Sequence, residues 1–163
     1  MHEPWRRLRR LARIAAESTS SACSIEPYPA THGDLCEAMT GRKGRGVPSK
    51  ILLIDDNEAL RRVLRIGLEK RGFTVFELGS GRGAEWLIAR RSIDVVVTDL
   101  FMPGREGLET ICALRESHEE LPIVAITGSN MADVATGLGA RVCLSKPVSL
   151  RTLTRALDEV LDK

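Results

Sequence analysis

The chain has 163 residues, of which 43% are hydrophobic, 28% charged and 4% aromatic, and its net charge is +2. These values fit one globular domain with a core of Val, Leu, Ile and Ala, and they disfavour two domains. No apolar run approaches the roughly 20 residues of a membrane-spanning helix, so we expect no membrane insertion.

The first part of the chain, residues 1–49, is predicted to be a basic, flexible extension. Residues 1–50 hold nine Lys and Arg against five Asp and Glu, whereas residues 51–163 hold fifteen against seventeen. Stretches rich in Ser, Pro and Gly follow a short arginine-rich segment, as in a linker. The five arginines of residues 1–13 permit contact with nucleic acid phosphates, but a solvated basic tail or a misassigned start codon is the favoured interpretation.

The cysteines and the N-terminus indicate the compartment. The four cysteines are far apart and form no Cys-x-x-Cys pair: Cys23, Cys36, Cys112 and Cys143. The segment MHEPWRRLRRLARIAAE contains too many arginines for the apolar part of a signal peptide, and a likeness to an organelle transit peptide is the weaker alternative. Reduced thiols and the missing secretory signal therefore predict a cytoplasmic protein.

Strands and helices are predicted to alternate from residue 50 onward. A strand over 51–54 (ILLI) ends in Asp55-Asp56, and a strand over 74–77 (TVFE) follows an amphipathic helix. The predicted buried face of that helix consists of Leu60, Val63, Leu64, Gly67 and Leu68. A glycine-rich loop then opens into a second helix.

The third strand, IDVVVTD at 93–99, has no polar alternation over Val95–Val97, so both of its faces should be covered, as inside a parallel sheet. A helix over 108–117 and a strand over 122–127 (PIVAIT) follow it. The chain then continues with a weak helix at 131–138, a strand at 141–145 (RVCLS) and a last helix. Five such alternations predict an α/β fold, a doubly wound five-stranded parallel sheet with helices on both faces.

Polar side chains stand at the C-terminal ends of four of these strands: Asp55-Asp56, Asp99, Thr127 and Lys146. Because the ends of parallel strands share one edge of the sheet, three carboxylates, a hydroxyl and an ammonium are brought together. Crowded carboxylates need a cation, and their all-oxygen donor set suits Mg²⁺. A metal, an ammonium, a hydroxyl and an attacking carboxylate are what phosphoryl transfer requires.

On these motifs (IDDNE, TDLFMPGREGLE, ITG and LSKP, in that order) residues 50–163 resemble a response-regulator receiver domain of two-component signalling. The resemblance implies the flavodoxin-like receiver fold with strand order 2-1-3-4-5. It also implies that Asp99 accepts a phosphoryl group from a histidine kinase or a histidine phosphotransfer protein. Asp56 and Asp99 would bind Mg²⁺ through their side chains, Phe101 through its backbone carbonyl and Asp55 through water.

Two further residues take roles from the resemblance. Thr127 would donate a hydrogen bond to the phosphoryl group and Lys146 would pair with it, and a cis peptide is expected at Lys146-Pro147. The sequence departs from the family pattern where Cys143 replaces the usual aromatic residue. A short spacing of eighteen residues between Thr127 and Lys146 also predicts a truncated fourth helix or preceding loop. Signalling, rather than phosphorylation, should be affected.

The last predicted helix ends at Lys163, so we expect a stand-alone receiver that docks to a downstream protein or relays phosphoryl groups. It would not be an enzyme, although it would assist its own phosphorylation and dephosphorylation. Rival interpretations are a Mg²⁺-dependent phosphohydrolase, which usually has a second Asp where Phe101 stands, and an unphosphorylated scaffold. Asp55 and Asp56 could also merely cap the following helix.

Overall fold

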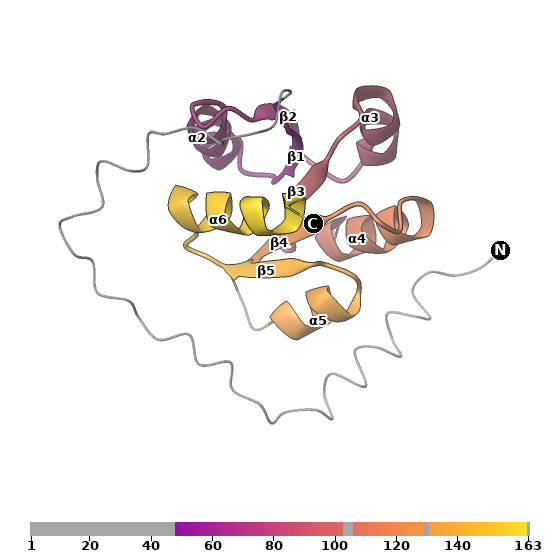
Figure 1. Ribbon diagram of the computed structural model, residues 1–163. Helices are drawn as coiled ribbons and strands as arrows, with labels where there is room; N and C mark the ends of the chain where they lie inside the picture. The colour runs from indigo at the N-terminus through magenta and orange to yellow at the C-terminus, as the bar shows by residue number, and fades with distance from the viewer. Residues whose placement is uncertain (1–47, 103–105, 129–130, 163) are drawn as a thin grey trace. The chain divides into compact units, whose positions relative to one another are not determined.

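Five strands and five helices make up the part of the chain that the computed structural model describes, residues 48–102, 106–128 and 131–162 (Figure 1). The strands are β1 (Lys50–Ile54), β2 (Thr74–Leu78), β3 (Val95–Asp99), β4 (Ile123–Thr127) and β5 (Val142–Ser145). The helices are α2 (Glu58–Glu69), α3 (Ala84–Arg91), α4 (Glu106–Ser117), α5 (Ala132–Gly137) and α6 (Leu150–Leu161). The strands pair in parallel in the order β2-β1-β3-β4-β5, which confirms the predicted fold class.

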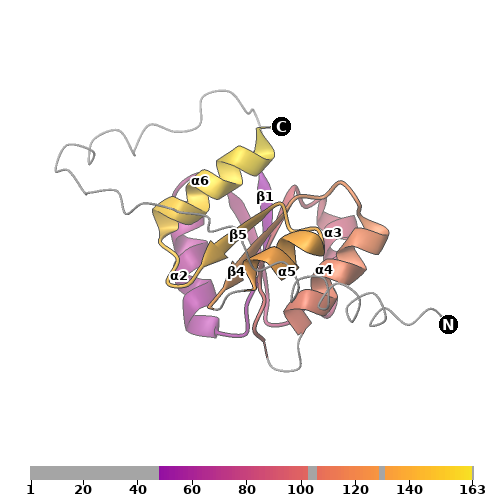
Figure 2. The ribbon, with the colours of Figure 1, turned by 90° about the horizontal axis from the view of Figure 1, so that it is seen from below.

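Helices cover both faces of the sheet. Figures 1 and 2 show α2 and α6 on one face and α3, α4 and α5 on the other. All five residues of β3 are buried, as its uninterrupted apolar sequence predicts for a central strand. Because side chains alternate along a strand, Ile51, Leu53, Val95 and Val97 share one face and pack in a single core cluster with residues of α2 and α6.

The buried face of α2 is narrower than predicted. Leu64 and Leu68 are buried, but Val63 is 67% exposed, so its assignment to that face was wrong. The five predicted residues span an arc of about 140°, and Val63 lies at its edge. Gly67, one turn further along, fits closely under Leu150 of α6, where a Cβ would overlap a methyl group of that leucine.

Helix α5 has only six residues, whereas the other described helices have eight or twelve. This agrees with the truncation expected between Thr127 and Lys146. A side chain of α4 holds the turn that follows: Arg115 donates from Nε and Nη2 to the Gly139 carbonyl at 3.0 and 2.9 Å. Gly139 has a φ of +112°, which disfavours any other residue there.

The predicted extension, residues 1–49, lies outside the described residues except for Pro48 and Ser49. Its boundary and its flexibility therefore stay predictions. Among the helices of the described ranges, none is long and apolar enough to cross a membrane.

Candidate functional site

Three of the predicted site residues continue the same face of the sheet. Side chains alternate between faces, so Asp55 follows Ile51 and Leu53, and Asp99 follows Val95 and Val97. By the same count, Lys146 follows Val142 and Leu144, which pack against the same core. The side chains of Asp55 after β1, Asp99 at the end of β3 and Lys146 after β5 therefore meet at one point on the C-terminal edge of the sheet.

Lys146 bridges the two aspartates. Its Nζ donates to Asp99 Oδ2 at 2.6 Å and to Asp55 Oδ2 at 3.5 Å. Both carboxylates are almost completely buried, and the lysine side chain keeps 31% of its exposure. The Lys146 ammonium thus compensates the charge of two carboxylates that lie far from it in the sequence, Asp55 at 91 residues and Asp99 at 47.

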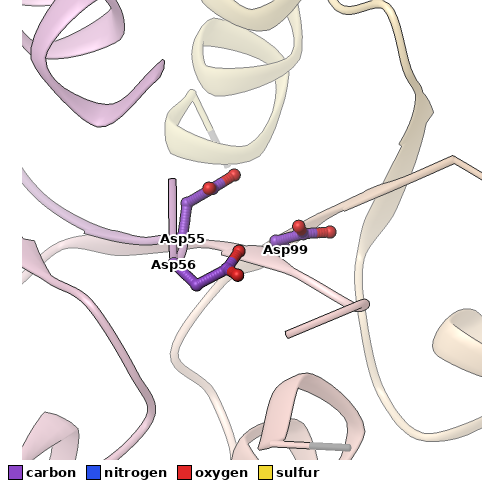
Figure 3. A group of neighbouring side chains, drawn as sticks. All are labelled: Asp55, Asp56 and Asp99. Atoms are coloured by element: carbon purple, nitrogen blue, oxygen red, sulfur yellow. The ribbon is translucent and has the colours of Figure 1, made fainter. Parts of the chain in front are cut away.

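The third carboxylate completes a candidate metal centre. Oxygen atoms of Asp55, Asp56 and Asp99 all lie within 4.8 Å of one another (Figure 3). Asp56 is exposed, so solvent can reach the cluster from its side. Hard carboxylate oxygens at this spacing fit Mg²⁺, which prefers oxygen ligands and keeps several waters.

The alternative that Asp55 and Asp56 only cap α2 is wrong. The N-cap is Asn57, whose side chain accepts a hydrogen bond from Leu60 N–H. Asp55 Oδ1 instead accepts from the Asn57 backbone N–H at 2.8 Å, which folds the chain back just after β1. Helix capping is therefore carried out by the next residue, and both aspartates remain available at the strand end.

The environment shifts the pKa of two site residues. Burial raises the pKa of the Asp55 carboxyl above its ordinary value, despite the opposing hydrogen bond from Asn57 and charge of Lys146. Burial alone would lower the pKa of Lys146, but its hydrogen bond to Asp99 and the charge of Asp55 outweigh burial and raise it. Lys146 is therefore a permanent cation here. The ionised form of Asp55 lowers the stability of the folded state.

We expect Asp55→Asn to raise the unfolding temperature at pH 7 in the absence of divalent cations. A carboxyl whose pKa is raised on folding stabilises the fold at pH below its unfolded pKa and loses that stabilisation as pH rises through the folded pKa. The asparagine carries no such cost, and it can still accept from the Asn57 N–H. Thermal melts should show the gain at pH 7 and its disappearance below the unfolded pKa of the carboxyl. Exposed Asp133→Asn serves as the control; a less stable Asp55→Asn protein at pH 7 would contradict the prediction.

Arg61 belongs to this site and was missed by the sequence analysis. Its Nη1 donates to the backbone carbonyl of Asp55 at 2.5 Å, and its Nε lies 3.9 Å from Glu77 of β2. A cation in the first turn of a helix opposes the helix dipole, and this was the one available signal of a partner outside the helix. The contact fixes the peptide that connects the two aspartates.

The structure places the two remaining predicted residues at the same edge. Thr127 is buried at the end of β4, and its carbonyl accepts from Lys146 N–H at 2.7 Å. Phe101 donates its backbone N–H to Asp99 Oδ1 at 3.1 Å, and the residue is 54% exposed. The Lys146-Pro147 peptide is cis, as expected. All six predicted positions thus lie at the C-terminal edge of the sheet.

Comparisons with known proteins agree with this geometry. The family model described as the response regulator receiver domain matches residues 51–158. The chain is 36% identical over 118 residues to the response regulator MprA of Mycolicibacterium vanbaalenii, covering 71% of this chain and 51% of the relative. It is 34% identical over 114 residues to the transcriptional regulatory protein AfsQ1 of Streptomyces coelicolor, covering 68% and 50%.

Solved structures show the same architecture. A receiver domain from Clostridium thermocellum superposes with a TM-score of 0.66 at 28% identity, covering 70% of this chain and 94% of that one. The chemotaxis protein CheY4 of Vibrio cholerae gives a TM-score of 0.65 at 28% identity, covering 71% and 100%. The chain spans about half the length of the two curated relatives above, so the match concerns one part of those proteins.

Proposed function

This chain belongs to the response regulator receiver domains of two-component systems, and on that basis we propose that Asp99 accepts a phosphoryl group from a phosphohistidine donor. The observation that supports this best is the position of the Asp99 carboxylate. It ends the central strand, one oxygen bonded to the Lys146 ammonium and the other to the Phe101 N–H. A nucleophile held in this way is oriented before the donor arrives.

In the proposed reaction, an oxygen of Asp99 attacks phosphorus in line with the bond to the donor nitrogen. The P–O bond forms as the N–P bond breaks, and the donor histidine leaves with the electron pair of that bond. Asp56 and Asp99 would hold Mg²⁺ directly, with the Phe101 carbonyl, and Asp55 through water; when bound, this ion supplies positive charge to the phosphoryl oxygens. The Lys146 ammonium pairs with the anionic product.

The direct test is phosphorylation by a small-molecule donor. Incubation of the full chain with acetyl phosphate and Mg²⁺ should add one phosphoryl group to the intact mass, and hydroxylamine should remove it because an acyl phosphate is labile. A chain that gains no mass, or that gains a hydroxylamine-resistant phosphate, would count against the proposal.

We also propose that the domain is not an enzyme for an external substrate. Phe101 stands two residues after Asp99, where the rival phosphohydrolase would place an acidic residue, and a phenyl ring can neither donate nor accept a proton. Slow hydrolysis of its own phosphoryl group is the only turnover proposed. Multiple turnover of p-nitrophenyl phosphate would favour the phosphohydrolase, and failure of all labelling would favour the scaffold.

Transmission of the signal is proposed to centre on the loops after β3 and β4. Cys143, on β5, is half-buried, and burial raises the pKa of its thiol, so it is a small neutral side chain. It cannot act as a ring that moves between exposed and buried positions. Thr127 and Phe101 flank Asp99 instead, and we propose that their rearrangement changes the binding of a downstream protein. We place this exchange in the cytoplasm, where the unbridged thiols of Cys112 and Cys143 are stable.

Lys146→Ala is expected to retain labelling and to lose the response. The ammonium meets the phosphoryl group after transfer, so it stabilises the phosphorylated conformation. Its removal also leaves two buried carboxylates uncompensated, which should destabilise the unphosphorylated fold by about 1–3 kcal/mol. Amide exchange with and without acetyl phosphate should show protection near Phe101 and Thr127 in the wild type but not in the variant. Exposed Lys70→Ala is the control; wild-type protection in Lys146→Ala would rule out the role.

A further inference from the structure

Helix α3 carries an exposed row of side chains that the phosphoacceptor site does not use. Trp86 and Arg90 are one helical turn apart on α3, and Arg82, in the loop before the helix, lines a pocket together with Trp86. All three are exposed, and 63% of the tryptophan surface is open. The chain has only two tryptophans. Burial of a tryptophan ring removes a large apolar surface from water, so an exposed tryptophan calls for an explanation.

Arginine holds the ring in place. The Arg90 guanidinium lies 5.5 Å from the centre of the Trp86 ring, within the range of a cation–π contact. Such a contact restricts the rotamers of both side chains before any partner binds, which lowers the entropy lost on binding. Trp and Arg are also the residue types that contribute most to protein–protein affinity.

A pocket of about 290 Å³ adjoins this row, between α3 and α4. Arg82 and Trp86 line one side of it, and Ala113 and Leu114 of α4 line the other. At one end, Gly81 passes so close to Thr110 that a Cβ on Gly81 would overlap the threonine hydroxyl. The pocket therefore has an apolar side, a cationic rim and room for a side chain of a partner.

The charge on this side of α3 is positive. Glu85 is the one acidic residue between Gly81 and Ser92, and its Oε1 accepts from the Ser117 hydroxyl of α4 at 3.0 Å. That contact directs the carboxylate toward α4, whereas Arg90 lies over the exposed ring and Arg82 lines the adjoining pocket. The row thus offers an aromatic surface with one cation over the ring and a second at the pocket.

We propose that Arg82, Trp86 and Arg90, with the adjoining pocket, bind an acidic amphipathic segment of a partner protein. Its carboxylates would pair with the two arginines and an apolar side chain would enter the pocket beside Trp86. Single-stranded nucleic acid is the less suitable occupant, since it needs successive stacking platforms and the row offers one. The proposal does not depend on phosphorylation of Asp99.

The fluorescence of Trp86 can test this in the full chain. Trp5→Phe leaves Trp86 as the only tryptophan, so its emission reports on this surface alone. The probe is a synthetic amphipathic peptide of Glu, Asp and Leu, and the control peptide has Gln and Asn in place of the acids. The acidic peptide should shift the emission to shorter wavelength as it covers the ring, and added salt should weaken binding. The neutral peptide should not bind.

Single substitutions test which side chains bind the acidic peptide. Arg82→Ala and Arg90→Ala, each with Trp5→Phe, should bind the acidic peptide about tenfold more weakly, as expected at an interface hot spot. Arg155→Ala, an exposed arginine of α6 on the opposite face of the sheet, should bind as the parent does. No emission shift with the acidic peptide, equal binding of the neutral peptide, or unchanged binding by Arg82→Ala would each overturn the proposal. Tighter binding of an oligothymidylate than of the peptide would assign the surface to nucleic acid instead.

Discussion

Asp99→Asn is expected to abolish the gain of a phosphoryl group from acetyl phosphate. Asparagine keeps the shape of the side chain and can still accept the Phe101 N–H, but its amide is not a nucleophile. The loss should be complete rather than partial, because Asp55 and Asp56 are proposed to hold the metal ion, Asp55 through water, and not to attack phosphorus. Intact mass spectrometry after incubation with Mg²⁺ measures the result.

Two further variants make this test specific. Asp56→Asn should reduce labelling sharply without moving the labelled position, since the role proposed for Asp56 is to hold the metal. Asp133→Asn, an exposed aspartate of α5, should label as the wild type does. Full labelling of Asp99→Asn at this edge of the sheet would show that the acceptor has been assigned to the wrong carboxylate.

Removal of divalent cations is expected to have an equally large effect. Without a metal ion, an incoming phosphoryl dianion meets three carboxylates whose oxygens lie within 4.8 Å of one another, and one ammonium compensates them only in part. Two of those carboxylates are buried, where the effective dielectric constant is lower than in water and repulsion is stronger. We therefore expect labelling by acetyl phosphate in excess EDTA to fall below detection.

A binding measurement separates this effect from damage to the protein. Mg²⁺ should raise the unfolding temperature of the wild type, because a ligand that binds only the folded state stabilises it. Mg²⁺ should change the unfolding temperature of Asp56→Asn only slightly. Readdition of Mg²⁺ to the EDTA-treated wild type should restore labelling. Undiminished labelling in EDTA would refute the assignment of a metal centre to this edge.

Much of the fold could be predicted from local sequence because its signals are local. The uninterrupted apolar run of β3 indicates a strand covered on both faces, and the alternation of strands with helices indicates a parallel sheet. Residues at the strand ends then meet at one edge whatever the loop lengths are. Asp55, Asp56, Asp99 and Lys146 could thus be grouped before any coordinates existed, and the structure brings them together.

What the sequence could not determine depends on contacts between distant segments. Val63 satisfies the helical period, yet it is exposed because the sheet and α6 cover a narrower arc than the pattern spans. Arg61 was missed because its partners, the Asp55 carbonyl just after β1 and Glu77 of β2, lie outside its own helix. The exposure of Trp86 also follows from how α3 lies against α4.

The sequence by itself therefore determined the class of fold, the family and the set of charged residues at the site, because periodicity and the order of strand ends are properties of the chain alone. Only the tertiary structure decided which oxygen of each carboxylate Lys146 contacts, that Asn57 rather than an aspartate caps α2, and which apolar side chains remain exposed. The physical reason is that burial and hydrogen-bond partners are set by the neighbouring elements, whose distances and angles no local pattern encodes.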